Sequence, residues 1–186
     1  MKIAAFDPGR IASYARLDTC RPFDIEIGEI TLIGTGRLLR PCPLHIAEII
    51  RDVDCCIVEE VGARTGQGVS AVFTFGLCAG TILGAVSAHG VPIELVSPRA
   101  WKSASRLGKL GDAEAKTASR HRAKEFWPQH AGTFDVKSNH GLAEAALMAR
   151  WYFLAGPGRD VGIDMRAEEN AAHEHGQSAK RKRKAA

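Results

Sequence analysis

The stretch Lys2–Gly9 constrains the fold of this chain more than any other. Its short apolar run stops at Asp7 and is followed at once by Pro8 and Gly9. This pattern predicts a buried strand that ends in a tight turn, with a carboxylate at its end. Such a carboxylate is costly unless a metal ion or a basic side chain lies opposite it. The alternative is that Asp7 only accepts hydrogen bonds from the turn.

A second apolar run ends in the same way. Cys55–Val58 is followed directly by Glu59 and Glu60. Because successive side chains of a strand point to opposite faces, only one of these glutamates can share a face with Asp7. Two strand-end acids in one small domain predict a metal-binding cleft.

Further apolar patterns complete a mixed α/β sheet. They predict strands over 11–17, 25–33 and 92–96, and helices over 43–51, over 69–88, from Ser97-Pro98, and over about 139–154, with a loop over 128–138. The first three strands follow one another closely, so we expect an antiparallel meander, with a bulge near Gly28. The later strands alternate with helices, which predicts parallel strands and helices that cover the faces of the sheet.

Chain length and composition suit one domain and a tail. Of the 186 residues, 45% are hydrophobic, which is enough for a core, and we expect a domain over 1–156 and a polar, disordered tail over 157–186. The tail holds a basic run, Lys180–Lys184, that would bind phosphates, although solubility or targeting would explain it equally well. The five cysteines have no C-x-x-C spacing, and the N-terminus shows no signal pattern, so we expect a cytoplasmic protein with reduced thiols.

The segment from Val69 to Ala88 contains no charged residue, so that its length alone would fit a membrane span. Its many small residues and its lack of basic flanks favour a helix buried in a soluble core, without membrane contact. Gly76, Gly80 and Gly84 recur every four residues and line one stripe of that helix. We expect a close contact there, across a dimer axis or against the chain's own sheet.

Two further groups of residues carry charge. Basic residues accumulate between Trp101 and Lys124, namely Lys102, Arg106, Lys109, Lys116, Arg120, Arg122 and Lys124. A solvated helix face would look the same, so this group is informative only if it borders the acids. On the last predicted helix, His140 and Glu144 share one face. We favour a shared metal ion for this pair over a structural lysine partner for Glu144.

With these motifs, the chain resembles the RuvC-like Holliday-junction resolvases, particularly the divergent forms of phages, from Met1 to about Leu154. The motifs that carry the resemblance are Phe6-Asp7-Pro8-Gly9, Ile57–Val61, Gln67–Ser70, Pro98–Lys102 and His140–Ala145. The resemblance implies a ribonuclease-H-like fold with a five-stranded sheet, a homodimer, and cleavage of four-way or otherwise branched DNA. It also implies two Mg²⁺ ions, for which Mn²⁺ would substitute, and further partners among recombination or phage-packaging proteins.

The resemblance also implies roles for individual residues. The implied metal ligands are Asp7, Glu59, His140 and Glu144. Glu60 would lie on the opposite face of its strand. Lys102 and Lys116 resemble basic residues near the scissile phosphate. The chain departs from the family at the last helix, where two aspartates often stand three residues apart, and at Gly62, where cellular resolvases have an aromatic residue.

Two rival interpretations come from other functional classes. A non-catalytic DNA-binding module could have the same fold, but the four ligand candidates argue against it. An actin-like phosphotransferase also begins with a strand that ends in an acid and a glycine. It would need a second domain and further phosphate-binding loops, for which we expect no room.

Overall fold

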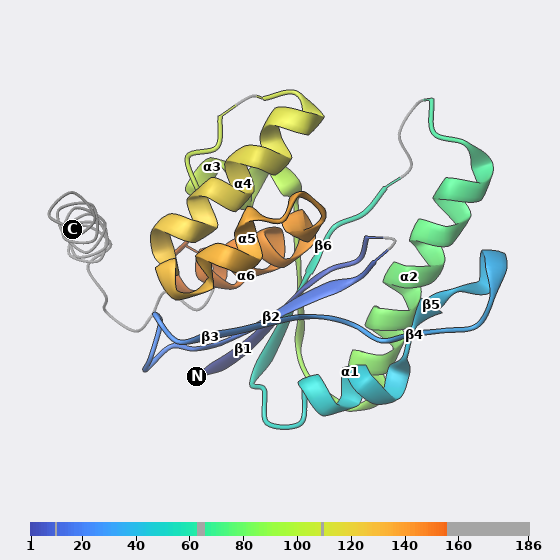
Figure 1. Ribbon diagram of the computed structural model, residues 1–186. Helices are drawn as coiled ribbons and strands as arrows, with labels where there is room; N and C mark the ends of the chain where they lie inside the picture. The colour runs from blue at the N-terminus through green and yellow to red at the C-terminus, as the bar shows by residue number, and fades with distance from the viewer. Residues whose placement is uncertain (10, 63–65, 109, 156–186) are drawn as a thin grey trace, which may run out of the picture.

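The computed structural model describes residues 1–9, 11–62, 66–108 and 110–155; the tail predicted over 157–186 lies outside them. A five-stranded sheet forms the centre of the molecule, in the order β3-β2-β1-β6-β7 (Figure 1). Its strands are β1 (Lys2–Asp7), β2 (Ser13–Asp18), β3 (Ile25–Glu29), β6 (Cys55–Glu59) and β7 (Ile93–Val96). The strands β1, β2 and β3 pair antiparallel, whereas β6 and β7 continue the sheet in parallel with β1. The predicted mixed sheet is confirmed.

Helices cover both faces of this sheet, as expected. One layer contains α3 (Pro98–Ala104), α4 (Asp112–Phe126), α5 (Ala131–Asp135) and α6 (His140–Ala155). The other contains α1 (Pro43–Ile49) and α2 (Val69–Ala88), which lie on the opposite side in Figure 1. Alternation along β1 divides the core between them, because Ile3 and Ala5 pack with the α6 layer, and Ala4 and Phe6 with α1 and α2.

The predicted bulge near Gly28 is wrong. Residues of β2 and β3 pair without interruption, and Gly28 lies opposite Tyr14. A Cβ on Gly28 would stand 2.7 Å from Tyr14 Cε1, so the glycine makes room for the tyrosine ring. The strand ends at Glu29. The residues beyond it form β4 (Leu32–Ile33), which pairs with β5 (Arg40–Pro41) in a separate two-stranded sheet, with the 3₁₀ turn η1 (Gly36–Leu38) between them.

The predicted loop over 128–138 also needs correction. It contains the 3₁₀ turn η2 (Pro128–His130), then α5, then the 3₁₀ turn η3 (Lys137–Asn139). Tertiary contacts hold this segment: Phe134 is fully buried, and Arg120 Nη1 donates to the carbonyls of Phe134 and Asp135 at 3.1 Å each. Elements this short have too few residues to show a period in the sequence.

The expectation that α2 is a buried core helix is only partly correct. Its bounds are as predicted, but its buried residues are confined to one side, namely Cys78, Ala79, Ile82 and Val86. Val69 is 87% exposed and Phe73 is 53% exposed. A Cβ at Gly76, Gly80 or Gly84 would meet no atom within 4 Å, so the glycine stripe does not contact the chain's own sheet. The helix α2 is long and apolar enough to cross a membrane. Core helices of soluble proteins often meet the same criterion of length and composition, so this is weak evidence for a membrane span.

Candidate active site

Asp7 and Glu59 lie side by side at one edge of the sheet. The parallel pairing of β1 with β6 runs up to Phe6 and Val58, so the next residues on the two strands are these acids. Both continue the strand faces that pack against the α6 layer, as Ala5 and Ile57 do. Glu60 follows the end of β6 and is exposed. The structure therefore places Glu59 beside Asp7, which is the arrangement that strand alternation predicts.

Glu144 of α6 brings a third carboxylate to this edge, and both it and Asp7 are buried. Burial raises the pKa of Asp7 well above its usual range, and repulsion from Glu144 and Glu59 raises it further. A hydrogen bond from the Gly9 backbone and the charge of Lys102 oppose this increase. Burial also raises the pKa of Glu144. Three acids thus share one poorly solvated region.

Two fully buried side chains donate hydrogen bonds to these acids. Trp101 Nε1 of α3 donates to Glu59 Oε1 at 2.9 Å. Ser119 Oγ of α4 lies 3.2 Å from Glu144 Oε1 and 2.9 Å from the carbonyl of Ala115, so its single proton is shared. Neither donor was predicted from the sequence. The signal for Trp101 was its place next to Lys102 in the Pro98–Lys102 motif.

Five of the seven residues of the basic stretch fall into two groups. Lys102 interacts electrostatically with Asp7 and Glu144, and Lys116 with Glu144 and His140. Three other members are used within the fold. They make their bonds as follows: Arg120 to the α5 carbonyls, Arg122 to the Ser105 carbonyl and Glu125, and Lys124 to Asp135. Lys109 lies outside the described residues. Lys102 and Lys116 therefore border the acids.

His140 shares its basic neighbour Lys116 with Glu144. Burial and the charges of Lys116 and Arg120 lower its pKa, whereas hydrogen bonds to the Lys137 and Ser138 backbone oppose this. The residue of α6 beside Asp7 is Gly141, where a Cβ would stand 2.9 Å from Asp7 Oδ2. Gly141 and Glu144, three residues apart, thus face the strand-end acid. The structure groups Asp7, Glu59, Glu144 and Lys102, and Lys116 interacts with both Glu144 and His140.

The donor set at this edge fits a hard divalent cation in its chemistry. Within the described ranges, no three His, Cys, Asp or Glu side chains are arranged as a ready metal-binding group. The acids nevertheless raise the pKa of Asp7 by mutual repulsion, and a bound cation would convert that repulsion into attraction. Carboxylate oxygens are the ligands that Mg²⁺ prefers in proteins.

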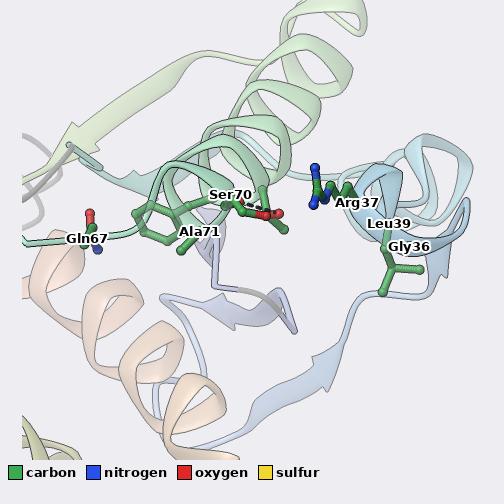
Figure 2. A pocket seen from close by; sticks show the side chains of 8 residues that line it. Gly36, Arg37, Leu39, Gln67, Ser70 and Ala71 are labelled. Carbon is green, nitrogen blue, oxygen red and sulfur yellow. Dashed lines mark hydrogen bonds between the residues drawn. The ribbon is translucent and has the colours of Figure 1, made fainter.

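A separate cavity of about 580 Å³ lies between η1 and the first turns of α2. Figure 2 shows Arg37 on one side of it and Gln67, Ser70 and Ala71 on the other. None of the residues predicted for the site lines this cavity. It is therefore distinct from the acid cluster.

Comparisons with known proteins relate the chain to junction resolvases. No protein-family model matches the chain. A curated protein of similar sequence is the chloroplastic Holliday junction resolvase MOC1 of Chlamydomonas reinhardtii, 33% identical over 101 residues. These residues make up 54% of this chain but only 11% of that protein.

Solved structures of similar fold include RuvC of Thermus thermophilus. The RuvC in complex with a Holliday junction substrate superposes with a TM-score of 0.51 at 18% identity, over 84% of this chain and 97% of that chain. A second Thermus thermophilus RuvC structure gives a TM-score of 0.51 over 82% and 95%, also at 18% identity. The chain therefore has the ribonuclease-H-like fold of RuvC, and its resemblance to the RuvC-like resolvases is confirmed.

Proposed function

We propose that this chain is a divalent-metal-dependent endonuclease that cleaves four-way DNA junctions, or related branched DNA, by hydrolysis of a phosphodiester. The observation that carries the proposal is the meeting of Asp7, Glu59 and Glu144 beside Lys102 at one edge of a RuvC-type sheet. Acids from β1, β6 and α6 converge there although they are far apart in sequence. The sequence similarity to a named Holliday junction resolvase supports the choice of substrate.

The proposed reaction assigns separate tasks to the acids and the lysines. Asp7, Glu59 and Glu144, with His140, would hold two Mg²⁺ or Mn²⁺ ions, which when bound supply Lewis-acid stabilisation and activate water at neutral pH. Lys102 and Lys116 would donate to oxygens of the scissile phosphate and stabilise the charge that develops there. The buried Asp7 keeps its carboxylate away from bulk water, so a cation that held it ionised would be attracted with little screening by solvent.

We also propose a homodimer in which α2 packs against α2 of a second copy. The exposed side of α2 carries no charge, and its glycines have open space where side chains would be. Glycine allows two helix backbones to approach closely. A four-way junction is two-fold symmetric, so a symmetric dimer would present two active sites to equivalent strands.

A cleavage assay tests the proposed function directly. A labelled four-way junction and a linear duplex of the same sequence are incubated with the full chain and Mg²⁺, alongside Asp7→Asn. We expect cleavage of the junction by the unaltered chain alone. Selective binding of the junction in Mg²⁺ and in Mn²⁺ without cleavage would instead support the non-catalytic binding module. Equal cleavage of both DNAs would contradict the structure specificity.

A further inference from the structure

The bond between Trp101 and Glu59 arises from the way α3 begins. The parallel strands β6 and β7 pair up to Glu59 and Val96, so the chain leaves β7 directly beside the acid. Ser97 then accepts a hydrogen bond from Ala100 N at 3.4 Å, and α3 starts at Pro98. Within its first turn, α3 delivers the indole of Trp101 into the core beneath Glu59.

An indole has a single polar group, an N–H that can only donate. When such a group is buried, it needs an acceptor, because an unpaired donor costs free energy. Trp101 uses a carboxylate oxygen of Glu59 at 2.9 Å. A bond to an ionised acceptor is stronger than one between neutral groups, so it holds the carboxylate in one orientation. A carboxylate can accept about four hydrogen bonds, and the indole therefore leaves it able to bind a cation.

A second buried indole in this chain donates to a backbone carbonyl, so a carboxylate is not required to satisfy a buried indole N–H. Trp127 Nε1 donates to the backbone carbonyl of Pro22 at 3.1 Å, and that bond lies outside the acid cluster. Both tryptophans belong to the same core. Trp101 differs in that its partner is one of the three acids, and in that the ammonium of the adjacent Lys102 lies 5.0 Å from its ring centroid.

We infer that Trp101 is a positioning residue of the proposed nuclease: its indole N–H orients the Glu59 carboxylate for the metal that the acids would hold. Trp101 touches neither substrate nor metal in this assignment and acts through Glu59. Its ring also forms part of the surface on which Lys102 rests, so one buried side chain organises an acid and a base of the same site. The inference rests on the proposed function.

The test compares Trp101→Phe with Trp127→Phe in the full chain. Each variant loses one indole N–H and keeps an aromatic ring in the core, so both should lower the melting temperature. Only Trp101→Phe should weaken the binding of Mn²⁺ to the DNA-free protein, by about 10- to 100-fold in calorimetry, as for other groups that orient metal ligands. It should also lower kcat for the junction, whereas junction binding in chelator should match that of Trp127→Phe.

The outcomes separate the two proposals. In one outcome, the unaltered chain binds Mn²⁺ and cleaves junctions, and both variants bind Mn²⁺ with the same affinity as the unaltered chain. This result would overturn the role of Trp101 but not the proposed function. An unaltered chain that neither binds Mn²⁺ nor cleaves junctions would overturn the proposed function, and the role of Trp101 with it. If Trp101→Phe does not fold, benzothienylalanine at position 101 or 127 replaces the N–H by sulfur in a ring system of nearly the same shape, and the same comparison applies.

Discussion

Gly141 lies against the carboxylate of Asp7. A Cβ on residue 141 would stand 2.9 Å from Asp7 Oδ2 and 2.7 Å from Ser13 Oγ, both closer than real Cβ contacts allow. Glycine is therefore what lets the first turn of α6 rest on the ends of β1 and β2. This seating brings Glu144, one turn later, to the same edge of the sheet as the strand-end acids.

Gly141→Ala should separate α6 from the sheet edge. The added methyl group meets Asp7 and Ser13, so we expect the free energy of unfolding to fall by about 1–3 kcal/mol and junction cleavage to be largely lost. Denaturant unfolding and a cleavage assay measure the two effects. Gly132→Ala in α5 is the matched control, because a Cβ there meets no atom within 4 Å. If Gly141→Ala behaves like this control, α6 does not depend on the glycine.

Asp7→Asn and Glu59→Gln should each abolish cleavage while junction binding stays largely intact. Each change removes one negative charge from the proposed metal site but leaves the basic surface that contacts phosphates. Gel shifts in chelator measure binding, and a labelled junction in Mg²⁺ measures cleavage. Cleavage at the normal rate in either variant would refute the assignment of the acids.

Glu60→Gln should have a much smaller effect than Glu59→Gln. Glu60 follows the strand end, is exposed, and is not among the groups that shift the pKa of Asp7, whereas Glu59 is. Cleavage rates of the two variants under identical conditions make the comparison. Equal losses would mean that both carboxylates serve the site.

The metal-free protein should lose stability as the pH rises from about 4 toward neutrality. The pKa of folded Asp7 lies well above its ordinary value of 3.8, and that of Glu144 lies above 4.5, so these two groups bind more protons in the folded chain than in the unfolded chain in this interval. The pKa of His140, which is lowered from 6.5, acts in the opposite sense but on a single group. The stabilisation from these two groups is therefore complete at pH values below their ordinary pKa values. It is lost as the pH rises through their raised pKa values in the folded chain. Asp7→Asn should flatten this dependence and raise the melting temperature at neutral pH. Melting curves in chelator from pH 4 to 8 measure it; an unchanged slope would contradict it.

Gly80→Leu should give a folded monomer. The glycine stripe has open space around it, so the substitution does not overpack the core, but it would block the close approach of two α2 helices. We expect a nearly unchanged melting temperature, a halved molar mass in light scattering, and nicking of one junction strand at most. A dimer that persists in this variant would place the contact elsewhere.

Features that depend on neighbouring residues were predicted correctly from the sequence. Asp7 and Glu59 were located because a strand that ends in an acid, and the alternation that separates Glu59 from Glu60, are local properties. The bounds of α2 and the cap at Ser97 were predicted for the same reason. The bulge predicted near Gly28 was wrong, because the missing side chain of this glycine makes room for the Tyr14 ring on the adjacent strand.

The completion of the candidate site depends on packing between distant segments. Glu59 and Trp101 are 42 positions apart, and their bond exists because β7 returns the chain beside β6 before α3 begins. The seating of α6 on the sheet likewise puts Gly141 beside Asp7 and leaves His140 near Lys116. Helical spacing predicted that His140 and Glu144 share one face of α6, but it cannot give the rotation of α6 about its axis. Close packing against β1 and β2 sets that rotation, since only a residue without a side chain fits against Asp7.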